Sequence, residues 1–85
     1  MKIYLQVEYS DKPGETKDVI CLASDMVKFE SHFNISIANL EKDIKITHLL
    51  FLAWASESRT KATTEPFEVW VDGIESVSAA DDPKA

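Results

Sequence analysis

One short stretch limits what this chain can fold into more than any other: the seven consecutive apolar residues of LLFLAWA, Leu49 to Ala55. A helix that crosses a membrane needs about 20 apolar residues, and this run is bounded by His48 on one side and Ser56-Glu57 on the other. The run is therefore too short to span a membrane. We expect it either to fill a core or to contact another protein.

The length and composition indicate one small globular domain. A chain of 85 residues corresponds to a single domain, and its 45% hydrophobic and 28% charged residues are typical of a folded, soluble protein. A domain of this size buries only about 60–65% of the surface that its unfolded chain exposes. The thin core that results leaves little room for a deep catalytic pocket.

The charge excludes some classes of partner. The formal net charge is −6, whereas nucleic acids and anionic membranes attract basic surfaces. We therefore predict neither nucleic-acid nor membrane binding. Mimicry of DNA is also disfavoured, because lysines interrupt the carboxylates along the chain.

The single cysteine, Cys21, cannot form a disulfide within the chain, which is typical of a reducing cytoplasm. Cys21 lies among Val19, Ile20 and Leu22, so we expect a small buried apolar residue there rather than a nucleophile. The first ten residues alternate apolar and polar side chains and do not form the apolar block of a signal peptide.

The N-terminal quarter predicts a β-hairpin over residues 2–22. Apolar side chains alternate along residues 2–9, which is the pattern of a strand with one buried face. Pro13-Gly14 suits the two central positions of a type II turn. The β-branched segment 16–22 then returns as the second strand, and helices must cover one face because two strands alone are barely stable.

Three helical segments are expected after the hairpin, at about 25–40, 44–61 and 66–77. Ser24 or Asp25 suits the N-cap of the first. Asn34 ends or kinks that helix, and a shorter helical piece follows with Ile37 and Leu40. Pro66 sits in the first turn of the last helix, where its missing N–H does no harm. The last helix carries an apolar stripe of Phe67, Trp70, Val71, Ile74 and Val77.

The central helix, 44–61, carries more apolar surface than one core stripe requires. The stripe consists of Ile46, Leu49, Leu50, Ala53 and Trp54. Phe51, Leu52 and Ala55 lie off this stripe, so the middle of the helix is apolar nearly all round and must be buried on several sides. Either the chain covers these side chains itself or a partner does.

The order of elements defines an α+β fold, with an N-terminal β-hairpin followed by three to four α-helices. We expect a single globular domain over residues 1–78. The end of the chain, residues 79–85, is small and acidic, and we expect it to be disordered.

No pattern of catalytic or metal-binding residues stands out. His32 and His48 lack zinc-ligand spacing with each other or with Cys21, and both are expected at the surface. Two glycines are too few for a phosphate-binding loop, and the scattered carboxylates are typical of a solvated face. We therefore predict no catalytic residue, no metal and no cofactor, and a protein that is not an enzyme.

The aromatic residues are the strongest candidates for function. Most aromatic side chains of a small domain fill its core, but aromatics are also favoured at the energetic centres of interfaces, and an apolar groove can take an amphipathic helix. Both possibilities stay open for each residue. The candidate partner-binding residues are Phe29, Phe33, Phe51, Leu52, Trp54, Phe67 and Trp70.

Three segments carry a resemblance to a known family: DMVKFESHFNISIANL (25–40), ITHLLFLAWASESRTK (46–61) and TTEPFEVWVDGIESV (63–77). In this order and spacing they resemble the tail assembly chaperones of long-tailed siphophages, especially those of actinobacteria. The ordered set carries the likeness, since no single motif is diagnostic. One departure lies at 55–58, where relatives often carry a longer or more basic stretch, and it bears on which surface meets the partner.

The resemblance implies a binding function. Such chaperones bind the phage tape measure protein, a long, helical, apolar-rich chain, and keep it soluble in the host cytoplasm until tail tube subunits replace them. They are not expected in the mature virion. Family members often also exist as a longer frameshifted form, and this chain would correspond to the shorter one. We further expect self-association in multiple copies, because a long client offers many sites and linked weak contacts add up.

A second class of function remains open. A small acidic phage-encoded inhibitor that binds one host protein would also need an apolar contact surface and a soluble exterior.

Overall fold

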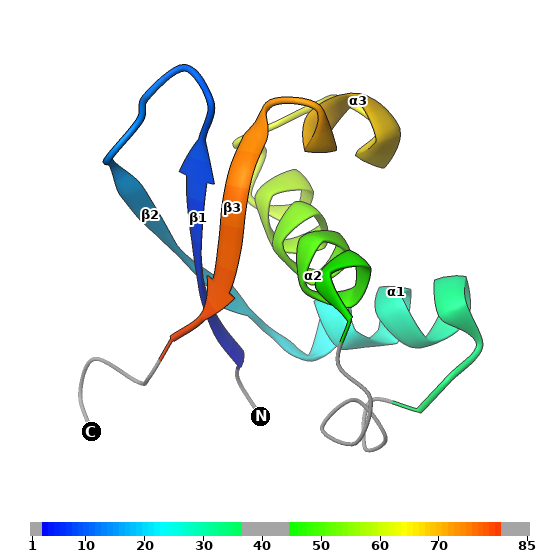
Figure 1. The fold of residues 1–85 in the computed structure, drawn as a ribbon. Coiled ribbons are helices and arrows are strands. Elements are labelled where there is room, and N and C mark those ends of the chain that lie inside the picture. The colour runs from blue at the N-terminus through cyan, green and yellow to red at the C-terminus, as the bar shows by residue number, and fades with distance from the viewer. Residues whose placement is uncertain (1–2, 37–44, 81–85) are drawn as a thin grey trace.

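The computed structural model describes residues 3–36 and 45–80. A three-stranded antiparallel sheet, in the order β2-β1-β3, packs against the helices (Figure 1). The strands are β1 (Ile3–Tyr9), β2 (Thr16–Cys21) and β3 (Ile74–Ala79), and the helices are α1 (Ala23–Phe33), α2 (Ile46–Arg59) and α3 (Phe67–Val71). The described residues therefore form one small α+β domain, in which α2 crosses one face of the sheet.

The N-terminal strands pair antiparallel as predicted, with Leu5 opposite Val19. Gly14 has φ of 84°, a conformation that favours glycine, and the Glu15 N–H donates to the Lys12 carbonyl at 3.1 Å, as a type II turn requires. The predicted hairpin is nevertheless only part of the sheet, because β1 also pairs with β3 on its other side.

Helix α1 is shorter than predicted and starts earlier. Its N-cap is Leu22 rather than Ser24 or Asp25, and the Asp25 carboxylate in the first turn accepts the Leu22 N–H at 2.9 Å. Asn34 ends the helix in the left-handed conformation, with its N–H donating to the Glu30 carbonyl at 2.8 Å. The predicted continuation to residue 40, with Ile37 and Leu40, lies outside the described residues.

The predicted helix over 66–77 is wrong in its second half. Only Phe67–Val71 is helical; the chain turns at Asp72 and Gly73, and Ile74–Ala79 forms β3. Val77 pairs with Val7 across the β1 interface and is buried. The edge of β1 that does not pair with β2 forms backbone hydrogen bonds with residues 74–79. The helical spacing of the apolar residues gave no sign of this pairing.

The start of the expected disordered tail is also corrected. Ala79 closes β3, and the Ala80 N–H donates to the Tyr4 carbonyl at 2.8 Å, so both residues belong to the sheet. Residues 81–85 lie outside the described part of the chain.

The core lies between the sheet and α2. Four members of the apolar run are buried, at 0–4% exposure: Phe51, Leu52, Ala53 and Ala55. Leu49, Leu50 and Trp54 are only partly buried. The chain thus covers most of the apolar surface of this run, and Leu49, Leu50 and Trp54 remain partly exposed.

Candidate partner-binding groove

Aromatic rings gather where α1, α2 and the start of α3 meet. We call this set the aromatic cluster; neighbouring ring centroids lie 4.5–6.4 Å apart, and its members are Phe29, His32, Phe33, His48, Phe51, Trp54 and Phe67. Pairs at such distances in tilted or edge-on geometry each contribute about 0.5–1.5 kcal/mol beyond simple burial. The cluster therefore holds the three helices together.

Phe51 occupies the centre of the aromatic cluster. The His32 ring stacks on it at 4.5 Å, and the rings of Trp54 and Phe67 lie at 5.4 and 5.5 Å. The helical spacing in the sequence places Trp54 on the apolar stripe of the central helix and Phe51 off it. Residues three apart are nevertheless neighbours on a helix surface. The two side chains therefore contribute to one surface.

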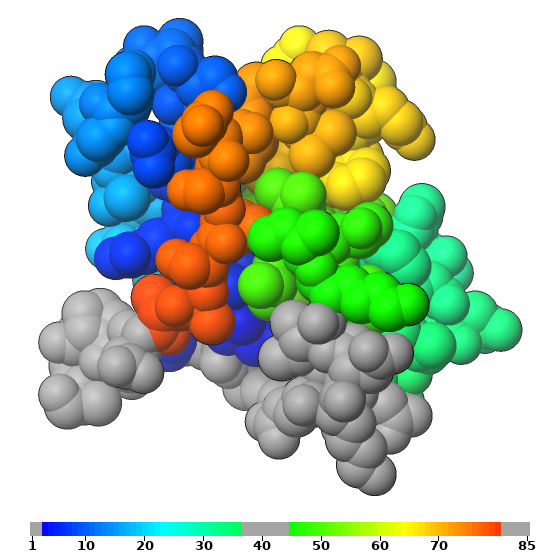
Figure 2. Space-filling model, viewed as in Figure 1, coloured from blue at the N-terminus to red at the C-terminus, as the bar shows by residue number. Residues whose placement is uncertain are grey.

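An open hollow of about 540 Å³ lies over this side of the aromatic cluster, and we call it the aromatic groove. Its floor is formed by α2, one wall by α1 and the other by the residues that begin α3. Its lining residues are Val27, Lys28, Ser31, His32, Phe51, Trp54, Pro66, Phe67 and Glu68. In Figure 2 the atoms of α1 and α3 stand apart on either side of α2.

The aromatic groove offers apolar surface to solvent. Phe51 is 4% exposed and forms the floor, whereas Trp54 and Phe67 are partly buried and Val27 is 61% exposed. The Trp54 indole N–H donates to the Glu65 carbonyl at 2.9 Å, which fixes the ring in place. A rigid aromatic surface of this kind binds with little loss of side-chain entropy.

The two walls of the aromatic groove differ in charge. Lys28 and the exposed His32 stand on the α1 wall, and Glu68 stands on the α3 wall. The groove therefore presents an apolar floor between a wall with a cation and a wall with an anion.

The seven predicted partner-binding residues separate into two groups. Phe51, Trp54 and Phe67 line the aromatic groove, and Phe33 is a partly buried member of the aromatic cluster. The other three are core residues at 0–4% exposure: Phe29, Leu52 and Trp70. Val27 and Pro66 also line the groove and were not predicted, although a valine next to the spacing of Phe29 and Phe33 was a signal in the sequence.

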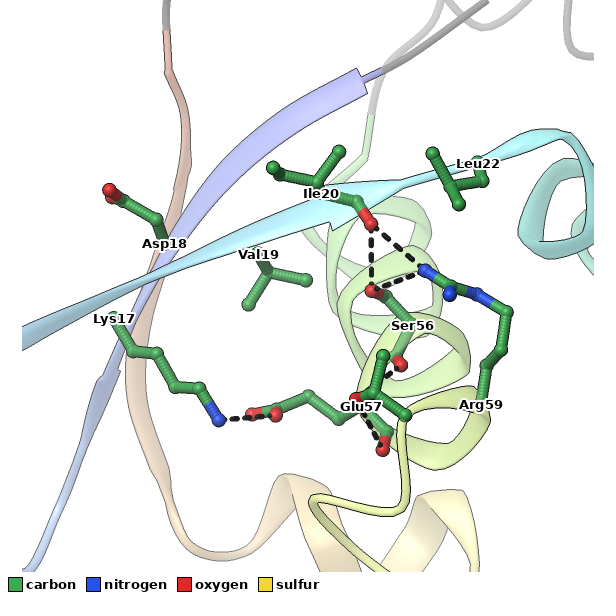
Figure 3. Close-up of a pocket in the computed structure, with 9 residues that line it drawn as sticks. Lys17, Asp18, Val19, Ile20, Leu22, Ser56, Glu57 and Arg59 are labelled. Carbon is green, nitrogen blue, oxygen red and sulfur yellow. Dashed lines mark hydrogen bonds and ion pairs between the residues drawn. The ribbon is translucent and has the colours of Figure 1, made fainter. Parts of the chain in front are cut away.

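A second hollow, of about 360 Å³, lies between β2 and the C-terminal half of α2 (Figure 3). We call it the polar pocket. It is lined by Lys17, Asp18, Val19, Ile20, Leu22, Ser56, Glu57, Arg59 and Thr60. Its charged groups are already paired: Lys17 Nζ lies 2.8 Å from Glu57 Oε2, and Arg59 Nη2 donates to the Ile20 carbonyl at 3.2 Å.

Two buried carboxylates anchor this side of the molecule. Asp25, at 0% exposure, pairs with Arg59 Nε at 3.1 Å. Glu57, at 2% exposure, accepts the Tyr9 hydroxyl as well as Lys17, and its burial raises the pKa of the Glu57 carboxyl above the ordinary 4.5. A raised carboxyl pKa is also found in active sites, but this carboxylate is held by two partners of its own chain.

Cys21 is fully buried, as predicted, and its thiol donates to the Leu52 carbonyl at 3.3 Å. Burial, with a smaller effect of the nearby Asp25 charge, raises the pKa of the Cys21 thiol to about 12. A thiol with so high a pKa is a poor nucleophile near neutral pH.

The expectation that both histidines lie at the surface is half wrong. His32 is exposed, but His48 is 7% exposed and contacts the rings of Phe29 and Phe33. Over residues 3–36 and 45–80, three or more His, Cys, Asp or Glu side chains nowhere converge as a metal site would require. None of the helices in these residues has the length and apolarity to cross a membrane.

No family model, curated protein or solved structure matches this chain. The described residues therefore define the protein only as a small α+β domain with an open aromatic groove beside its central helix.

Proposed function

We propose that this protein is a tail assembly chaperone of a long-tailed phage, which binds the tape measure protein and keeps it soluble during tail assembly. The observation that carries the proposal is the aromatic groove, where Trp54 and Phe67 remain partly exposed over a rigid aromatic floor. The order of the three segments at 25–40, 46–61 and 63–77, which resembles that family, supports it.

The dimensions of the groove suit a helical client. A volume of about 540 Å³ is within the range of pockets that bury drug-sized ligands, about 300–1,000 Å³, so it has room for apolar side chains of a partner. An amphipathic helix docks by inserting side chains spaced one turn apart into such a groove. A tape measure chain, long and rich in apolar helical segments, offers this surface many times.

The charges of the walls orient the client. Lys28 on the α1 wall favours an acidic flank of the bound helix, and Glu68 on the α3 wall favours a basic flank. We therefore expect preferred client segments to carry Asp or Glu on one side of the apolar ridge and Lys or Arg on the other.

The net charge of −6 fits the same role. Copies bound along an apolar client would give the complex a negative surface, and like charges keep such assemblies apart and soluble. Each contact is small, so multiple copies along one client, with or without a longer frameshifted form, would supply the affinity.

Co-expression with the tape measure protein tests the proposal. The tape measure protein alone should be insoluble, and the chaperone should raise its soluble fraction and co-purify with it. If solubility stays unchanged even with the longer form present, the proposal fails. A complex with a folded host protein and no effect on the tape measure protein would favour the inhibitor instead.

Two variants localise the contact. Combining Trp54→Ala with Phe67→Ala removes the partly exposed rings of the aromatic groove and should abolish the gain in solubility. Val69→Ala is the matched control, because Val69 is a 49% exposed apolar residue of α3 that does not line the groove. The control should solubilise the client as well as the unchanged protein does.

A further inference from the structure

The sheet has two edge strands, β2 and β3, and they differ in how their outer edges are protected. An edge strand presents unpaired N–H and C=O groups that invite pairing with another strand. Soluble proteins usually block such edges with charged residues, prolines or covering side chains.

The β2 edge is blocked. Its Ile20 carbonyl accepts the Ser56 hydroxyl at 2.8 Å and the Arg59 guanidinium at 3.2 Å, as Figure 3 shows. Further along, Lys17 and Asp18 place opposite charges on the exposed part of the strand. Side chains of α2 and these charges together exclude a further strand at this edge.

The β3 edge is open. Because the Ala80 N–H donates to the Tyr4 carbonyl of β1, alternation along the strand points the N–H and C=O groups of Val77 and Ala79 away from β1. Within residues 3–36 and 45–80, no hydrogen bond reaches these outward groups. Figure 2 shows β3, in orange, at the surface along its length.

The composition of β3 gives this edge no protection. The strand IESVSA carries one charge, Glu75, and neither lysine nor proline. Ser76, Ser78 and Ala79 are small, uncharged and exposed, so the backbone can be approached closely from outside.

We propose that β3 pairs antiparallel with β3 of a second copy of this chain, about a two-fold axis at Val77. In this register Val77 faces Val77 of the second copy, Ser76 faces Ser78, and Glu75 faces Ala79. The only charge of the strand then lies opposite a methyl group and never opposite its own symmetry mate. The strand is thus complementary to itself in charge and in size.

A two-fold pairing also completes the sheet. The outer strands of the combined sheet are the two β2 strands, whose edges are blocked, so assembly ends at the dimer. No residue of β3 lines the aromatic groove, so the dimer carries two free grooves. The pairing does not depend on the proposed chaperone function.

The oligomeric state tests the proposal. Sedimentation equilibrium over about 1 μM to 1 mM should show a reversible monomer–dimer equilibrium, which corresponds to a Kd in the range of modest interfaces. Ala79→Pro removes an outward N–H but leaves the bonds of Ser78 and Ala80 to β1. It should raise the dimer Kd at least about tenfold, because the symmetric interface loses this hydrogen bond twice.

Asp18→Pro is the matched control, because it removes an outward N–H from the blocked β2 edge. It should leave the dimer Kd within about twofold, since β2 does not take part in the interface. A protein that stays monomeric over the whole range, or a dimer that Ala79→Pro does not weaken, overturns the proposal.

A charge pair tests the register and remains decisive if the proline variant does not fold. Ser76→Lys with Ser78→Lys places like charges opposite each other across the axis, whereas Ser76→Lys with Ser78→Glu places opposite charges there. The first variant should dimerise at least about fivefold more weakly than the second. Equal dimer Kd values for the two would overturn the pairing at Val77.

Discussion

The aromatic groove and the polar pocket lie beside the same helix and differ in what their atoms have already bound. In the polar pocket Lys17, Glu57 and Arg59 find their partners within the chain at 2.8–3.2 Å. In the aromatic groove Trp54 and Phe67 still present apolar surface to water. A hollow with satisfied groups stabilises the fold, whereas a hollow with uncovered apolar surface gains free energy by binding.

This difference predicts separate consequences for the two sides of α2. Substitutions near the polar pocket should change stability and leave client binding intact. Substitutions in the aromatic groove should change binding with a small effect on stability.

The largest effect concerns Cys21, the fully buried last residue of β2. With a pKa of about 12 in the fold, against 9.0 for an ordinary thiol, its thiolate fraction at pH 8 falls on the order of 1,000-fold. Labelling by a thiol-specific disulfide reagent should therefore be slower by roughly that factor in the folded protein than in urea. Rapid labelling of the folded protein would show that β2 and α2 separate readily and that burial does not protect the Cys21 thiol.

The next effect concerns the buried ion pair. Asp25→Ala removes the carboxylate that pairs with Arg59, which keeps its bond to the Ile20 carbonyl, and leaves the Leu22 N–H without its acceptor. We expect the free energy of unfolding to fall by about 2–4 kcal/mol, as measured by urea denaturation. Lys28→Ala, on the exposed wall of the aromatic groove, is the control and should change it by less than about 0.5 kcal/mol. Equal losses for both would remove the distinction between the two hollows.

The features on the polar-pocket side of α2 were not equally predictable from the sequence. The hairpin turn and the burial of Cys21 follow from local rules, namely strand alternation and the requirement of a type II turn for positive φ at Gly14. The ion pairs do not, because Asp25 and Arg59 lie 34 residues apart and only the fold brings them together. A buried carboxylate cannot be told from a solvated one by its position in the chain.

The wrong helix at 66–77 has the same cause. Phe67, Trp70 and Val71 have helical spacing and do form α3, but Ile74 and Val77 continue that spacing and belong to β3. Gly73 was the local signal for a break. Pairing with β1 decided the outcome, and tertiary contacts of this kind regularly override local propensity.

The candidate groove was predictable only in part. Its aromatic residues stand out in the sequence, but whether each is exposed depends on how the helices pack. Trp54 and Phe67 were identified with their exposure unknown, and Trp70, equally aromatic, is 4% exposed in the core. What decides between groove and core is whether another element covers the ring. For Trp54, α1 and α3 stand too far apart to cover it fully.

A smaller effect is expected for Trp54→Ala in the aromatic groove. The variant loses a partly buried ring and the bond to the Glu65 carbonyl, and we expect unfolding to become easier by about 1–2 kcal/mol. Under the proposed function, affinity for a tape measure peptide should fall at least about tenfold, as measured by titration calorimetry. Asp25→Ala, assayed below its unfolding transition, should bind the peptide normally. An unaltered affinity of the Trp54 variant would place the contact elsewhere.

The smallest effect is the pH dependence contributed by Glu57. Burial raises the pKa of this carboxyl above 4.5, so the folded protein keeps the proton to a higher pH than the unfolded chain does. Stability from this group is therefore fully present below about pH 4.5 and is lost as pH rises through the folded pKa. Relative to Glu57→Gln, the free energy of unfolding of the unchanged protein should decline over that window and then level off, as measured by urea denaturation at each pH.

Trp54→Ala is the control, because it leaves the polar pocket untouched, and it should show the same dependence of the free energy of unfolding on pH. A difference that instead grows with pH would mean that the pairing with Lys17 outweighs the burial of the carboxylate, since only a lowered folded pKa gives that sign.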